Sequence, residues 1–533
     1  MALYDSAARQ SPAMKAPVTT RVAGIFYRHW LEALFIFAIV LVGAEILLTR
    51  YFPFSEKNVT ESLQETFPSK LKIDHFRPVY FPRPGCEAEG VTFRSVSGAP
   101  GEPPVATIQK MTIQGNYANF LFRPHYISRV ILQGLRIQVP ALGKGGKFTG
   151  GYTNSQMSIG ELLANGTVLE IARAHKPALR FDIHELGLDS VSSKDGMSYK
   201  VRMQNAEPPG EIRSNGHFGP FNAENPGQTP VAGSYSFRRG DLSVFDGIAG
   251  IVGSEGQFSG PLEHVAVRGT TDVPDFEVDR SGHTGHLATR FQGSVNGTNG
   301  DVTLDEVNAT YQNTKIVVKG SVADKKGYEG KFTSLDFTVR QGRLQDILRL
   351  IVKESRPPMS GAISLQAHAT LPPEGQAFLK ELALLGDFEI ADGHFENPDT
   401  QRDVNELSET ARGLKKSQKE EDKNNPGENV TSGGSGHVDL KNGVARVSNL
   451  SFTVPGADAL VQGTFNVLNE KIDFHGTMKM EAKFSQSTSG IKSLLAKVLD
   501  PFFNKKRGSI VPVMAGGTYH QPHFGLDLNP AKK

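Results

Sequence analysis

Residues 291–324, FQGSVNGTNGDVTLDEVNATYQNTKIVVKGSVAD, alternate apolar with polar side chains and reach a Gly or Asn every few residues. Successive side chains of a strand point to opposite faces, so this period of two predicts strands with one apolar and one polar face. The alternation recurs in GLRIQVP, ALRFDI, LDFTV, AISLQAHATL and KIDFHGTMKM. With 56 glycines in 533 residues available for tight turns, the chain is expected to be mainly β.

Helical periodicity is confined to a few short segments. SEKNVTESLQETF (55–67) places Val59, Leu63 and Phe67 on one face, which predicts a short helix. GRLQDILRLIVKE (342–354) and QAFLKELALLG (376–386) carry similar apolar stripes. These segments are typical of helices that pack on a sheet.

Composition and motifs exclude several classes of function. With 58 Lys and Arg against 56 Asp and Glu, there is no positive excess for binding nucleic acid. The single Cys86 excludes an intrachain disulfide, and we interpret it as a loop or strand-end residue. No nucleophile elbow, HExxH or Walker motif occurs, and the pairs His283/His286 and His520/His523 fit surface positions. No catalytic residue, metal ligand or cofactor is predicted, so we do not expect an enzyme.

Residues 30–52, WLEALFIFAIVLVGAEILLTRYF, predict a single transmembrane helix. At ~1.5 Å per residue this helix spans roughly 31 Å, with aromatic residues at both ends. The preceding tail, 1–29, has four Arg or Lys residues against Asp5, which predicts a cytoplasmic tail and export of everything after the helix. The VGA at 42–44 also resembles a signal-peptidase site, but the long charged tail and the continuing ILL favour a retained anchor.

The exported part divides at residues 401–436, a charged and then Gly- and Ser-rich segment predicted to be a flexible linker. It separates a β region at 53–400 from a C-terminal β region at 437–533. The latter contains an amphipathic helix at 491–503, which fits either a membrane-surface helix or a lid on the end of the sheet.

The strands outnumber the helices that could cover their apolar faces. A curved, incompletely closed sheet could leave these faces as an open trough for acyl chains. A pair of ordinary β-sandwiches would fill the same faces with its own side chains, and the pattern does not distinguish the two arrangements.

The N-terminal helix, the following KLKIDHFRPVYFPRPGCEAEGVTF, and the end segments GHVDLKNGVARVSNLSFTVPGADALVQGTFNVLNEKIDFHGTM and GSIVPVMAGGTYHQPHF resemble AsmA-like proteins and their C-terminal region. The resemblance implies an elongated, twisted antiparallel β-groove with a few short packing helices, related to TamB and chorein-type bridge-like lipid transfer proteins. It also implies a single-pass protein of the bacterial inner membrane with its bulk in the periplasm. We count about 20 to 25 strands, or about 100 to 120 Å of stacked sheet, which is shorter than the long members of the family.

The expected function is therefore to bind lipid acyl chains and support phospholipid transport and outer-membrane biogenesis. The expected partners are phospholipids, the inner membrane and other envelope proteins. The alternative is a scaffold or assembly factor for outer-membrane proteins that transports no lipid. The predicted lipid-binding residues are the apolar members of the alternating runs: Ile316, Val318, Leu335, Phe337, Ile363, Leu365, Phe388, Ile390, Phe465, Val467, Ile472, Phe474, Met478 and Met480.

Overall fold

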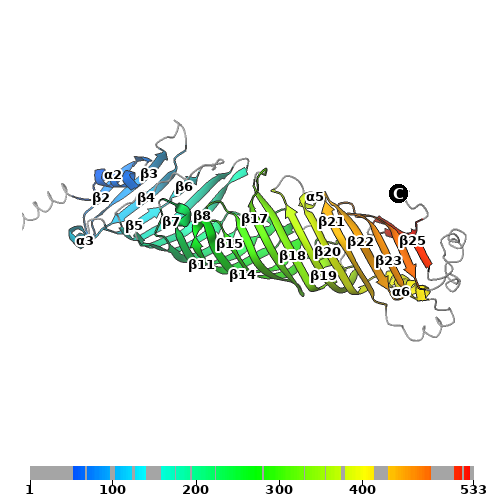
Figure 1. Ribbon diagram of the computed structural model, residues 1–533. Helices are drawn as coiled ribbons and strands as arrows, with labels where there is room; N and C mark the ends of the chain where they lie inside the picture. The colour runs from blue at the N-terminus through cyan, green and yellow to red at the C-terminus, as the bar shows by residue number, and fades with distance from the viewer. Residues whose placement is uncertain are drawn as a thin grey trace, which may run out of the picture.

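The computed structural model describes residues 52–527, except 67–68, 96–102, 123–125, 140–157, 174–175, 193–194, 223, 279–280, 329, 354–355, 374–377, 413–429, 482–508 and 519–520. Within these residues, 26 strands are connected through hydrogen-bonded pairings into one sheet. Figure 1 shows that the strands succeed one another along a single long axis, from the blue N-terminal end to the red C-terminal end. The mainly β fold expected from the alternating pattern is confirmed.

The N-terminal end of the sheet contains two broken strands. β1 and β2 both pair with β3, and β5 and β6 both lie between β4 and β7. The bounds of these strands are β1 (Ser69–Lys72), β2 (His75–Val79), β3 (Gly85–Ser95), β4 (Ala106–Gln114), β5 (Tyr126–Gln133), β6 (Arg136–Val139), β7 (Ser158–Arg173) and β8 (Lys176–Ser192).

The sheet is mixed, which corrects the expectation of a purely antiparallel one. β5 and β6 run parallel to β7, whereas the other pairings of the described residues are antiparallel. Parallel neighbours need a crossover of a dozen or more residues, and the chain between Val139 and Ser158 is long enough to provide one. The alternating pattern predicts strands, but it does not show whether neighbouring strands run parallel or antiparallel.

From β7 onward each strand pairs antiparallel with the next, except that the two-residue β12 pairs only with the end of β14. The middle strands are β9 (Gly196–Asn205), β10 (Gly210–Phe218), β11 (Pro230–Asp241), β12 (Ile248–Ala249), β13 (Ile251–Pro261), β14 (Val265–Val278), β15 (Gly285–Val295), β16 (Val302–Tyr311) and β17 (Thr314–Asp324). The C-terminal strands are β18 (Lys331–Arg343), β19 (Met359–Leu371), β20 (Ala383–Phe395), β21 (Ser432–Lys441), β22 (Val444–Val454), β23 (Ala457–Asn466), β24 (Lys471–Met480), β25 (Ser509–Thr518) and β26 (Gln521–Leu526).

The helices are few and short. They are α2 (Glu56–Thr66), α3 (Tyr117–Phe122), α4 (Leu344–Arg349), α5 (Phe378–Glu381) and α6 (Pro398–Arg412), with single 3-10 turns η1 (Pro226–Gln228), η2 (Leu242–Val244) and η3 (Leu262–His264). The helices predicted near residues 55–67 and 342–354 are confirmed as α2 and α4. The helix predicted over 376–386 is reduced to α5, because β20 begins at Ala383 and takes the rest of that apolar stripe into a strand.

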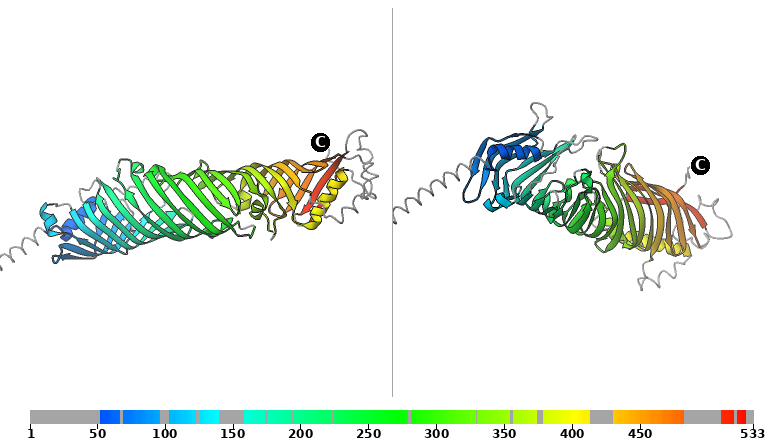
Figure 2. Two further views of the ribbon diagram at one scale, coloured as in Figure 1. Left: turned by 90° about the horizontal axis from the view of Figure 1, so that it is seen from below. Right: turned by 60° about the vertical axis from the view of Figure 1, so that its left-hand side comes forward.

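The largest buried cluster lies at the N-terminal end, beneath α2 (Figure 1). It joins Phe52, Phe54 and Val59 to apolar residues of β3, β4 and β5. Cys86 is fully buried in this cluster near the start of β3. Elsewhere the sheet has no second sheet packed against it in the described residues, and it curls around its long axis (Figure 2).

Several expected features fall on residues that the structure does not describe. The expected anchor at 30–52 lies outside the described residues except for Phe52, and the expected helix at 491–503 lies entirely outside them. No helix within the described ranges has the length and apolar character needed to cross a bilayer. The expected linker at 401–436 begins within α6 and ends within β21, and residues 413–429 between them are not described.

Candidate functional site

One continuous row of side chains crosses the sheet from β8 to β25. Each member is the direct register partner of the next, so all of them lie on the same face, which we call the apolar face; the opposite one is the polar face. The row consists of Leu186, Val201, Ser214, Tyr235, Gly256, Gly269, Phe291, Val307, Val318, Phe337, Ala367, Gly386, Val438, Val447, Gly463, Phe474 and Ala515. At ~4.8 Å per strand, this central row is roughly 77 Å long.

The predicted lipid-binding residues lie on or beside this row. The exposure of β24 alternates without interruption, with Ile472, Phe474, Met478 and Met480 half-buried and the residues between them exposed. In the other strands the register likewise brings the predicted residues to the apolar face, as in the neighbouring pairs Val318 with Phe337 and Leu365 with Phe388. Val467 is the exception, because it follows the last residue of β23. The period-two pattern therefore identified one face of one sheet.

Helices cover part of this face, which the pattern did not reveal. α4 packs its Leu344, Ile347 and Leu348 side chains into a cluster that contains four of the predicted residues. α6 contributes Val404 and Leu407 to a second cluster, which contains two more. The predicted residues within these two clusters are Ile316, Ile363, Leu365, Ile390, Met478 and Met480. These six side chains belong to clusters that the protein's own helices help to form.

A third cluster lies near the opposite edge, around Leu440, Ala445 and Val467, and Phe465 packs against it. Six of the predicted residues belong to none of the four buried clusters in the described part of the chain: Val318, Leu335, Phe337, Phe388, Ile472 and Phe474. They are half-buried, and they share no buried cluster with a residue of α4 or α6. We call these six residues the uncovered band.

The apolar face changes character toward the N-terminal half. There the central row contains Ser214 and Tyr235, and the adjacent row places Ser254, Thr271 and Thr289 side by side on β13, β14 and β15. The Tyr235 hydroxyl lies 3.1 Å from Ser254 Oγ. Sequence analysis missed this group, because hydroxyl residues also occupy polar faces and only the register shows which face carries them.

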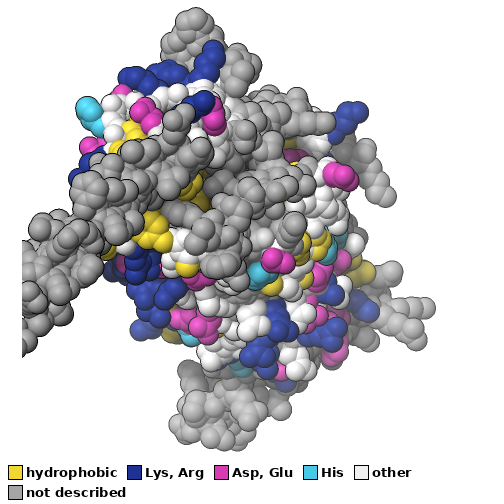
Figure 3. Space-filling view, turned by 90° about the vertical axis from the view of Figure 1, so that its left-hand side faces the viewer, with side chains coloured by type: hydrophobic (Ala, Val, Ile, Leu, Met, Phe, Trp, Pro, Cys, Tyr) yellow, Lys and Arg dark blue, Asp and Glu magenta, His cyan; other side chains and the backbone are white. Residues whose placement is uncertain are grey.

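Figure 3, viewed toward the N-terminal end, shows hydrophobic side chains between an upper and a lower band of charged ones. A pocket of about 1200 Å³ lies against β7 to β15, and none of the predicted lipid-binding residues lines it. Within the described ranges, no group of three or more His, Cys, Asp or Glu side chains is close enough to hold a metal ion.

The chain was compared with family models, curated proteins and solved structures. No family model, no curated protein and no solved structure matches the chain.

Proposed function

We propose that this chain binds lipid acyl chains along the uncovered band of its apolar face and supports phospholipid transport from a bacterial inner membrane. The observation that carries the proposal is the central row, in which Ser214 and Tyr235 are the only polar members across 17 strands. Each lipid methylene removed from water contributes about 0.8 kcal/mol without directional preference. Such contacts suit a ligand that moves along the sheet.

A lipid is a better candidate than a second protein layer to cover the uncovered band. Val318, Leu335, Phe337 and Phe388 are half-buried, and they belong to none of the clusters that include residues of α4 or α6. Helices α4 and α6 cover the apolar face along one edge. The remaining apolar surface, the uncovered band, needs an apolar partner. The segment at 30–52 would hold this surface next to the bilayer that supplies the lipid.

The test compares the same substitution on the two faces of the sheet. Leu335 lies on the apolar face, whereas Leu385 lies on the polar face and is 48% exposed. We expect Leu335→Glu to abolish the phospholipid that co-purifies with the protein in native mass spectrometry, because a carboxylate on the apolar face disfavours acyl chains. Leu385→Glu should retain it.

Thermal unfolding of both variants establishes that they are folded. If folded wild-type protein contains no phospholipid above the detergent background, or if both variants retain it equally, the transport proposal is wrong. A membrane-tethered β scaffold, the alternative expected from the sequence, would then be the better description.

A further inference from the structure

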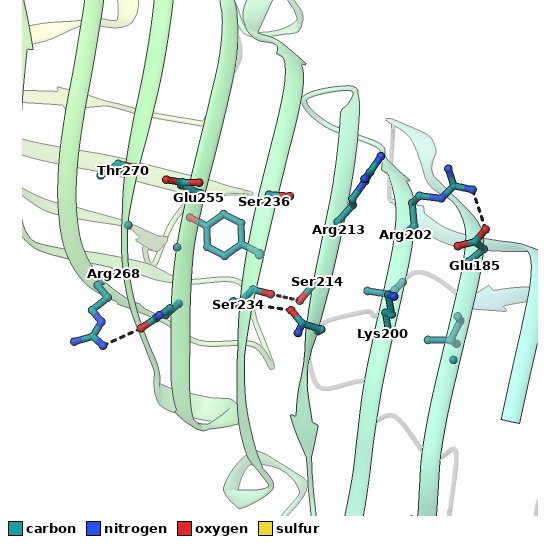
Figure 4. Close-up of a pocket in the computed structure, with 18 of the residues that line it drawn as sticks. Glu185, Lys200, Arg202, Arg213, Ser214, Ser234, Ser236, Glu255, Arg268 and Thr270 are labelled. Atoms are coloured by element: carbon teal, nitrogen blue, oxygen red, sulfur yellow. Dashed lines mark hydrogen bonds and ion pairs between the residues drawn. The ribbon is translucent and has the colours of Figure 1, made fainter. Parts of the chain in front are cut away.

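The pocket of about 1200 Å³ against β7 to β15 is lined by two rows of polar-face residues and by the central-row residues between them, from Leu186 on β8 to Phe291 on β15. One polar-face row of register partners runs through Glu185, Arg202, Arg213 and Glu255, and the other through Lys200 and Arg268. Figure 4 shows both rows crossing the strands, with Ser234 and Ser236 between the cationic groups. The pocket is therefore a trough that runs across the strands.

The lining is rich in positive charge. It contains five Lys or Arg side chains and two Glu side chains, in a chain whose net charge is only +2. Arg202 Nη2 lies 3.0 Å from Glu185 Oε1, but Arg202 Nε is buried and has no hydrogen-bond partner. An unpaired buried donor of this kind carries an energetic cost that the rest of the fold must offset.

Three further cations of the trough lack a carboxylate partner among the described residues: Lys200, Arg268 and Arg290. Arg268 Nη2 instead donates to Gln257 Oε1 at 2.8 Å. These three side chains lie near the two ends of the trough, on β9, β14 and β15. Unpaired positive charge is therefore available near both ends of the trough.

The position of the trough excludes recognition of an acidic peptide by strand addition. That mode needs a free sheet edge, whereas each strand beneath the trough is hydrogen-bonded on both sides. The uncharged lining includes nine hydroxyl or amide side chains, such as Asn215, Ser234 and Gln257, beside apolar residues and glycines. The hydroxyl and amide groups suit a ligand that carries many hydroxyl groups. From β8 to β15 the trough extends about 29 Å, enough for several linked sugar units.

We propose that this trough binds a linear acidic polysaccharide, with Lys200, Arg268 and Arg290 contacting its anionic groups. The site lies on the opposite face of the sheet from the proposed lipid band and does not depend on it.

The probe is a hexameric oligouronate prepared from alginate, with maltohexaose as the neutral counterpart, and binding is measured by titration calorimetry. We expect the oligouronate to bind with an affinity that falls as salt is added, and maltohexaose not to bind. The triple variant Lys200→Gln/Arg268→Gln/Arg290→Gln should weaken binding about tenfold or more, the factor expected for three exposed ion pairs.

The matched control carries the same charge change on the polar face of β17 and β24. Lys315→Gln/Lys319→Gln/Lys479→Gln replaces three exposed lysines away from the trough and should leave the affinity unchanged. Equal weakening in both triples, or equal binding of the two sugars, overturns the proposal. Binding of phosphatidylglycerol vesicles through the same three residues, without binding of the oligouronate, also overturns it and assigns the trough to a membrane surface.

Discussion

Phe291 of β15 and Gly269 of β14 are direct register partners, and a Cβ placed on Gly269 would lie only 2.9 Å from Phe291 Cζ. The same relationship joins Tyr235 to Gly256, where the corresponding distance to Cε1 is 2.8 Å. In both pairs the glycine leaves room for a ring to lie against the neighbouring strand. The aromatic side chains therefore add apolar surface without filling the space above the central row.

This relationship predicts that Gly269→Ala destabilises the protein. The added methyl would also meet the Glu255 carbonyl oxygen, at 2.4 Å, so the strands must shift, at a cost of about 1–3 kcal/mol. Gly253→Ala is the control, because its nearest atoms are 3.9 Å away, and it should change stability by less than about 1 kcal/mol. Chemical denaturation measures both free energies of unfolding, and equal values for the two variants would contradict the prediction.

A second prediction concerns His475 on the polar face of β24. Its Nδ1 lies 2.9 Å from Asp527 and its Nε2 lies 3.1 Å from Asp473. The hydrogen bond with Asp527, more than that with Asp473, raises the pKa of His475 above its ordinary 6.5, against the opposing effect of burial. The protonated histidine thus holds the residue after β26 against β24.

Because this pKa is higher in the folded protein, the stabilisation is fully present below about pH 6.5 and is lost as the pH rises through the raised value. Hydrogen exchange of β25 and β26 should therefore quicken, relative to intrinsic rates, as the pH rises above about 6.5. In His475→Gln that pH dependence should disappear. An unchanged pH profile in the variant would show that the histidine does not hold this edge.

A third prediction concerns the buried carboxylate at the start of α4. Asp346 accepts a hydrogen bond from the Thr314 hydroxyl at 2.9 Å and another from the Asn313 N–H at 3.1 Å. Thr314→Val preserves the shape but leaves the carboxylate with one partner fewer, so it should cost about 1–3 kcal/mol. Thr303→Val, at an exposed position of β16, should have little effect. Thermal unfolding distinguishes them, and a stable Thr314→Val variant would contradict this account.

A fourth prediction concerns Cys86. Burial raises the pKa of its thiol to about 12, so hardly any thiolate is present at neutral pH. The folded protein should react with Ellman's reagent far more slowly than the same protein in denaturant. Fast labelling without denaturant would mean that the N-terminal cluster opens readily.

The sequence predicted which residues lie on the apolar face, but it did not predict which of them a helix covers. Phe337 and Ile363 both lie on the apolar face, as their alternation indicates, yet Ile363 is 6% exposed beneath α4, whereas Phe337 lies outside that cluster. The alternation at both positions is the same. What differs is whether a helix formed by other residues packs over the side chain.

The polar trough was beyond sequence reasoning for a related reason. Arg202 and Arg268 belong to strands separated by long stretches of chain, and no local motif connects them. Only the register of β9 through β14 brings them to one face of the sheet. Charge counted over the whole chain is nearly balanced and hides the local excess.

The sequence by itself determined that this chain forms strands with one apolar and one polar side, because the direction of a side chain along a strand depends only on its immediate neighbours. The tertiary structure decided the parallel pairing of β5 and β6 with β7, the coverage by α4 and α6, and the assembly of the cationic trough. Each of these depends on contacts between residues far apart in the chain, and a period of two carries no information about them.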